Sequence, residues 1–181
     1  MGTVKVTNIE PIADNGTVTL GSSGDNLVIG SGAVPKFMYP AFEAELTSDQ
    51  SVSDATITVI QYDQENLDTD SCYDNSTNYR FTPTVAGKYY VYASTNLRGS
   101  SSNTVTATVL YLYKNGSQIG SHVYENQSIN VRSQSHTITQ IVDMNGSTDY
   151  IDARGYIDVT SGSPVVKAND RSIFGAYRIG G

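Results

Sequence analysis

The chain has 181 residues, and its 18 acidic side chains outnumber its 11 basic ones, which gives a formal net charge of -7. This acidic balance and the absence of a basic run argue against a nucleic-acid-binding protein. Ser, Thr, Val, Tyr, Gly and Asn dominate and no stretch has a helical period, so the sequence predicts an all-β protein.

Two absences narrow the class of protein further. Cys72 is the only cysteine, so a disulfide within the chain is impossible and packing must hold the fold together. No stretch approaches the roughly 18 apolar residues of a membrane span, and no apolar segment follows Met1. We therefore expect neither membrane insertion nor export by a cleaved signal.

Residues 1–36 differ from the rest of the chain because they contain no aromatic side chain. Their apolar residues fall in short runs between glycines, as in 16–21 and 24–30, which predict two brief strands. The segment is too short and too thinly apolar to fold alone. We interpret 1–36 as a β-rich stem or attachment segment and 37–181 as a second, globular domain.

The globular domain begins with short strand patterns separated by turn signals. Residues 37–46 alternate but contain Pro40, which predicts an edge or bulged strand. Residues 55–62 predict a second strand, and the acidic stretch 63–78 predicts a loop or a weakly paired hairpin.

The next strand has tyrosines on both of its faces. Gly87 predicts a bend, and the alternation after it places Tyr89, Val91 and Ala93 on one face and Tyr90 and Tyr92 on the other. A hydrophobic core accounts for the first face. The second face is unusual for a monomer, which has little reason to expose a row of aromatic rings.

The remaining strands follow in the same way. Residues 104–120 predict a strand that runs into a hairpin at Asn115-Gly116. Residues 128–147 predict a strand, a loop, a second strand and another Asn-Gly turn. Residues 149–162 alternate cleanly, with Ile151, Ala153, Ile157 and Val159 on one face and Tyr150, Asp152, Arg154, Tyr156 and Asp158 on the other. A final strand has Gly175 at its middle, and a total of about eight to ten strands fits an antiparallel two-sheet jelly-roll sandwich.

The order of several short motifs resembles the globular domain of the complement C1q and tumour-necrosis-factor (TNF) superfamily. The motifs are Phe81-Thr82-Pro83 with Gly87 and Tyr89, Lys114-Asn115-Gly116, Asp149-Tyr150 and Phe174-Gly175. Together with the aromatic-rich first strand, the resemblance covers about residues 37–180. This resemblance implies a TNF-like and C1q-like jelly roll that assembles as a homotrimer, in which aromatic side chains of one sheet meet around the three-fold axis. We expect the trimer interface to include Tyr90, Tyr92, Tyr111, Tyr113 and Tyr177, with the alternative that half of them fill the sandwich interior.

The Gly-, Thr- and Val-rich segment before the globular domain is similar to segments that precede knob domains in bacteriophage fibres. This resemblance implies a virion protein, assembled in the host cytoplasm, whose residues 1–36 contact other virion proteins. The jelly roll would then present loops to a host-surface receptor, a glycan or a protein. The predicted receptor-binding residues, in loops 96–103 and 161–170, are Leu97, Arg98, Ser100, Ser101, Asn103, Lys167 and Asn169.

No constellation of residues predicts catalysis, so we expect a protein that is not an enzyme. His122 and His136 lie in polar, loop-like sequence and are predicted to be solvated. The acidic surroundings of Cys72 predict a raised thiol pKa and an unreactive side chain. Asp68 and Asp70 are weak candidates for a calcium site. Apart from calcium, we expect no cofactor. Two alternatives to a fibre remain open, a structural trimer that decorates or cements a capsid and a secreted ligand of the same superfamily.

Overall fold

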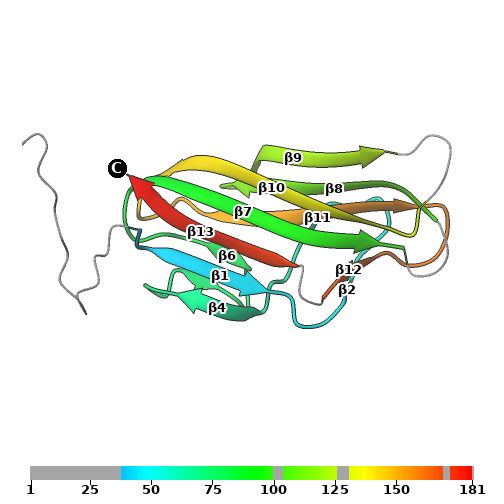
Figure 1. Ribbon diagram of the computed structural model, residues 1–181, viewed down its shortest axis with the longest axis horizontal. Coiled ribbons are helices and arrows are strands. Elements are labelled where there is room, and N and C mark those ends of the chain that lie inside the picture. The colour runs from blue at the N-terminus through cyan, green and yellow to red at the C-terminus, as the bar shows by residue number, and fades with distance from the viewer. Residues whose placement is uncertain (1–37, 100–103, 126–130, 169–171, 181) are drawn as a thin grey trace, which may run out of the picture. The chain divides into compact units, whose positions relative to one another are not determined.

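The computed structural model describes residues 38–99, 104–125, 131–168 and 172–180. This part of the chain holds thirteen strands, more than the eight to ten expected, in two antiparallel sheets (Figure 1). It contains no helix, in agreement with the predicted all-β sandwich. Among these residues no helix is long and apolar enough to cross a membrane. The predicted stem, residues 1–36, lies outside the described residues.

The first sheet has seven strands and is built around β7 (Gly87–Arg98). β10 (Ser133–Met144) pairs with β7 along its whole length on one side. On the other side β7 pairs with β13 (Ile173–Gly180) near its start and with β12 (Val165–Lys167) near its end. The sheet continues through β1 (Ala41–Glu45) to β4 (Gln64–Asp68) beyond β13, and β2 (Gln50–Ser51) pairs with β12.

The second sheet has six strands and is centred on β11 (Ile151–Val159) and β8 (Val105–Lys114). Beyond β8 it ends at β9 (Ser117–Glu125), and β6 (Arg80–Phe81) and β5 (Tyr73–Asp74) extend it on the other side. β3 (Thr58–Val59) also pairs with β11. The predicted Asn115-Gly116 hairpin joins β8 to β9, and both turn residues have positive φ, 51° and 78°. Such a turn favours Asn followed by Gly.

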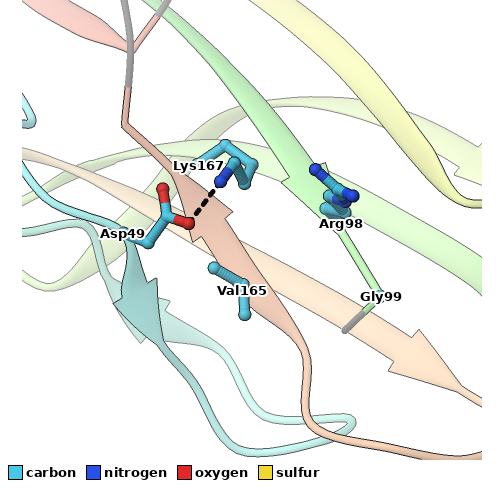
Figure 2. A pocket seen from close by; sticks show the side chains of 5 residues that line it. All are labelled: Asp49, Arg98, Gly99, Val165 and Lys167. Carbon is cyan, nitrogen blue, oxygen red and sulfur yellow. Dashed lines mark hydrogen bonds and ion pairs between the residues drawn. The ribbon is translucent and has the colours of Figure 1, made fainter. Parts of the chain in front are cut away.

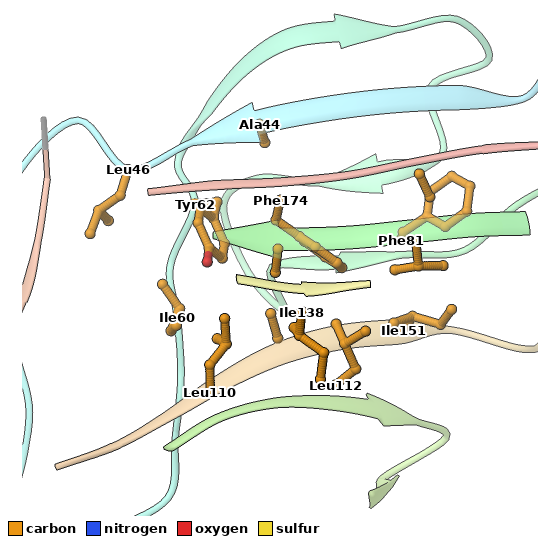
Figure 3. Packing of buried hydrophobic residues seen from close by; sticks show 14 of the residues in the cluster. Ala44, Leu46, Ile60, Tyr62, Phe81, Leu110, Leu112, Ile138, Ile151 and Phe174 are labelled. Carbon is orange, nitrogen blue, oxygen red and sulfur yellow. The ribbon is translucent and has the colours of Figure 1, made fainter. Parts of the chain in front are cut away.

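The core fills the space between the two sheets. The predicted alternation of β7 is confirmed, because Tyr89, Val91 and Ala93 are buried and Tyr90 and Tyr92 are only partly covered. Figure 3 shows Phe81, Phe174 and Ile138 gathered with Leu110 and Leu112 between the sheets. The aromatic centre is Phe42, whose ring stacks on those of Tyr73 and Phe81 at centroid distances of 4.6 and 4.5 Å.

One prediction for the first half of the domain is confirmed in one of its alternatives, and two are corrected. Of the edge or bulged strand expected at 37–46, the structure shows the bulged one, because β1 pairs with both β13 and β4 and its register with β4 shifts between Glu43 and Ala44. The expected strand at 55–62 is reduced to the two residues of β3. The acidic stretch 63–78 contains β4 and β5, so only part of it is a loop.

The second half departs from prediction at β10. Residues 133–144 form one continuous strand, where a loop was expected to interrupt it. The Asn145-Gly146 turn that follows is confirmed, and it connects β10 in one sheet to β11 in the other. The Asn145 side-chain oxygen accepts the backbone N–H groups of Ser147, Thr148 and Asp149.

The domain has two distinct ends. At one end the N–H of Arg178, near the C-terminus, donates to the carbonyl oxygens of Met38 and Pro40, both at 3.3 Å. From this end β7 runs the length of the sheet and finishes with Arg98 at the opposite end, close to β12 and β2 (Figure 1). The described residues therefore enter and leave at the same end, and the other end is free of both.

Candidate functional site

Three tyrosines and an isoleucine form a patch on the outer face of the seven-stranded sheet. Tyr90 lies opposite Tyr177 on β13 and opposite Ile141 on β10, and its ring centroid is 5.4 Å from that of Tyr177 and 6.3 Å from that of Tyr92. Ile141 is 58% exposed, which is unusual for a large aliphatic side chain in the middle of a sheet. We call this patch, Tyr90, Tyr92, Tyr177 and Ile141, the tyrosine face.

A glycine and a carboxylate hold Tyr92 within the tyrosine face. A Cβ atom at Gly175 would lie 2.4 Å from the Tyr92 ring, so the ring lies directly over the glycine. The Tyr92 hydroxyl donates to Glu43 Oε2 at 2.5 Å. Burial and this contact with a carboxylate raise the pKa of Tyr92. The ring is thereby fixed in position and its hydroxyl remains protonated at neutral pH.

Tyr111 and Tyr113 lie on the outer face of the other sheet. They alternate on β8 with the buried Leu110 and Leu112, and their centroids are 5.9 Å apart. The Arg154 guanidinium covers the ring of Tyr113 at 4.0 Å.

The five tyrosines predicted for a trimer interface therefore fall into two groups. One group lies on the outer face of the seven-stranded sheet and the other on the outer face of the six-stranded sheet. None of the five fills the interior, since all are partly exposed. Glu43, Ile141 and Gly175 were not predicted as site residues. The outward position of Ile141 does follow from the two-residue alternation of β10, in which Ile138 and Val142 are buried.

The predicted receptor-binding residues meet in part at the end of the domain away from Met38. A hollow of about 190 Å³ is lined by Asp49, Arg98, Gly99, Val165 and Lys167, and we call it the end pocket (Figure 2). It brings together Arg98 and Lys167, two of the residues that the sequence singled out, and adds Asp49, which it did not.

The other predicted receptor residues do not join this pocket. Leu97 is fully buried in the core, so its prediction as a receptor contact was wrong. Residues 96–98 belong to β7, so the prediction that the loop begins at residue 96 was wrong. Ser100, Ser101, Asn103 and Asn169 lie outside the described residues.

Asp68, one of the two calcium candidates, accepts hydrogen bonds from the residues that follow it. The Asp68 carboxylate accepts the backbone N–H groups of Asp70, Cys72 and Tyr73, at 3.4, 3.1 and 2.9 Å. In the part of the chain that the structure describes, no three His, Cys, Asp or Glu side chains converge on a metal position. Asp68 thus shapes the turn between β4 and β5 through hydrogen bonds.

The two histidines contact each other, and one of them is buried, which corrects the prediction that both are solvated. His136 on β10 is 2% exposed, its Nε2 is 2.7 Å from the Thr108 hydroxyl and its Nδ1 is 3.3 Å from Nδ1 of His122 on β9. Burial, and then the proximity of His122, lower the pKa of His136 to about 4. Cys72 behaves as predicted, because burial and the nearby Asp68 raise its thiol pKa.

Comparison with known proteins identifies the class of fold. No family model matches the sequence, and no curated protein matches it. A TNF structure, Eiger from S. frugiperda, matches with a TM-score of 0.56 and 11% identity over 77% of this chain and 91% of that one. The globular domain of the zebrafish complement 1qA protein matches with a TM-score of 0.55 and 12% identity over 77% of this chain and 97% of that one.

The chain therefore folds as a jelly-roll domain of the C1q and TNF type, as the order of its motifs predicted.

Proposed function

We propose that the chain is a non-enzymatic protein that forms a homotrimer through the tyrosine face. The supporting observation is the exposed Ile141 beside Tyr90 and Tyr177, an apolar patch that is costly to leave in water. Burying one tyrosine removes on the order of 150–200 Å² from water, so the rings of three chains would supply much of an interface. The motif resemblance also implies a trimer.

Within this proposal the trimer is the head of a bacteriophage virion fibre. Residues 1–36 tether it to other virion proteins, and the jelly roll presents its free end to the host surface. The position of Met38 and Gly180 at one end of the domain supports this arrangement, because the opposite end is left open for recognition. Three copies on one stem would add avidity to weak individual contacts.

The tyrosine face is tested by the solution mass of two matched variants. Tyr90→Glu places a charge in the proposed interface and is expected to reduce the mass measured by light scattering from three chains to one. Tyr111→Glu makes the same change on the opposite sheet and should leave the trimer intact. A monomeric wild-type protein, or equal loss of the trimer in both variants, contradicts the proposal.

The tether is tested by a deletion of residues 1–36. The shortened chain should still form trimers but should no longer join virus particles, which immunoblotting of purified particles would show. Incorporation of the shortened chain at the wild-type level would exclude a tethering role.

A secreted ligand of the same superfamily is the second candidate, and the likeness to the Eiger TNF structure favours it over a capsid cement. Immunogold labelling separates the three functions by location. Label at fibre tips supports the fibre head, label on capsid faces supports a cement, and label absent from particles supports the ligand.

A further inference from the structure

The outer face of the seven-stranded sheet becomes polar toward the free end of the domain. After Tyr92 the same face of β7 continues with Ser94, Asn96 and Arg98. The hydroxyl groups of Ser94 and Thr137 lie 3.1 Å apart. This half of the face therefore lacks the rings that support self-association and offers hydrogen-bonding groups instead.

The carboxylate in the end pocket is already satisfied by its neighbours. Asp49 forms an ion pair with the Lys167 amino group through Oδ2, and its Oδ1 accepts the backbone N–H of Ala168 at 3.0 Å. The hydrogen bond from Lys167 lowers the pKa of Asp49. Asp49 thus stays ionised at neutral pH and fixes the Lys167 amino group at the edge of the pocket.

Arg98 supplies a positive charge that forms no ion pair with another described residue. Among the described residues that line the pocket, the charges of Asp49 and Lys167 cancel and Arg98 leaves one net positive charge, in a chain whose total is -7. Such a local reversal of sign attracts anions, and a guanidinium binds carboxylate or sulfate through two parallel hydrogen bonds.

We propose that the end pocket binds the anionic group, carboxylate or sulfate, of an acidic saccharide. Arg98 is the main ligand, the fixed amino group of Lys167 is a second donor, and Val165, opposite Arg98 in the β12–β7 pairing, offers an apolar surface to the sugar ring (Figure 2). A volume of about 190 Å³ is below the roughly 300 Å³ of sites for drug-sized ligands, so it suits one sugar unit. The receptor role of this site rests on the proposed function, but the binding itself requires only one chain.

The proposal is tested by calorimetric titration of the full chain with glucuronic acid, sulfated glucose and glucose. We expect saturable binding of at least one acidic sugar with a Kd of about 1 mM and no binding of glucose. Comparing the two acidic sugars shows which anionic group the pocket prefers. Arg98→Gln should weaken the binding about tenfold or more, since it removes a charged hydrogen-bond partner.

Lys88→Gln is the matched control, because it removes one positive charge from the opposite end of the same strand, where Lys88 pairs with the exposed Asp143. It should leave the Kd unchanged. Equal weakening by Lys88→Gln, binding of glucose as tight as that of the acidic sugars, or no binding up to about 10 mM would overturn the inference. Light scattering on the same samples separates the two proposals: a trimer that binds no acidic sugar overturns only the pocket, and a monomer that binds one overturns only the trimer.

Discussion

At the scale of single residues, His136 is the clearest case of a polar group placed inside the sandwich. It faces the Thr108 hydroxyl on one side and His122 on the other, and these contacts join β10 to β8 and β9 across the two sheets. Close approach of the same strands is also seen at Gly120, where a Cβ atom would lie 2.5 Å from the Gln140 side-chain oxygen. The imidazole therefore fills a narrow position between two edge strands.

This position makes the stability of the domain depend on pH. The folded protein holds His136 at a pKa of about 4, below the ordinary value of 6.5, so the unfolded chain binds more protons between these values. Its contribution is fully present above pH 6.5 and is lost as the pH falls toward 4. At roughly 1.4 kcal/mol per pKa unit, the loss amounts to a few kcal/mol.

Urea unfolding at several pH values between 7 and 4 measures this effect. The free energy of unfolding should fall with pH more steeply in the wild type than in His136→Gln, which keeps a hydrogen-bonding side chain without a titratable ring. Carboxylates titrate in both proteins and cancel in the comparison. Equal slopes would show that His136 does not control acid sensitivity.

At the scale of elements, one aromatic ring links strands from both sheets. Phe42 on β1 stacks on Tyr73 of β5 and Phe81 of β6, and it meets Phe174 of β13 edge-on at 5.0 Å. The ring is 1% exposed. The short strands β5 and β6 are therefore held to the seven-stranded sheet largely by this cluster.

Phe42→Ala is expected to destabilise the domain by about 3–5 kcal/mol, because it removes a buried ring and leaves a cavity. Chemical denaturation followed by tyrosine fluorescence would measure the change. Met38→Ala, which shortens a 52% exposed side chain on the same segment, serves as a control and should cost less than about 1 kcal/mol. A loss below about 1 kcal/mol in the Phe42 variant would mean that the cluster does not hold the sheets together.

The sequence was sufficient to predict elements whose faces alternate and whose turns have a local code. The inward and outward faces of β7 and β11 and the Asn115-Gly116 hairpin follow from two-residue periodicity and from positive φ. The division between sheets did not follow, because pairing partners far apart in the chain leave no local signal. For this reason the sequence predicted the Asn145-Gly146 turn but not that the chain passes from one sheet to the other there.

The errors at the candidate sites have related causes. His136 was read as solvated from its polar neighbours, although it is in phase with the buried Ile138 on β10. The five tyrosines were treated as one group because alternation within a strand cannot show which sheet the strand joins. Arg98 and Lys167 were selected as loop residues, yet both are strand residues that meet at the end pocket.

At the scale of the whole molecule, the trimer proposal couples folding to assembly. If the tyrosine face is buried between chains, the folded form is stabilised by mass action and its Tm depends on protein concentration. We expect the Tm of the wild type to rise with concentration in calorimetry and that of Tyr90→Glu to stay constant. A Tm of the wild type that is independent of concentration would show that this face contributes little to stability.

The single thiol offers an independent view of how the native domain opens. Cys72 is 5% exposed, and its Sγ lies 3.4 Å from Asp68 Oδ1 at the turn between β4 and β5. A thiol-specific dye should therefore react with the folded protein only when that turn detaches, so the labelling rate becomes a clock for local opening at this corner of the sandwich. Labelling as fast as that of a free cysteine would show that this turn is open in solution. Slow labelling that accelerates in urea would show that the turn is closed in the native domain, and the natural Cys72 would then report its opening without an engineered probe.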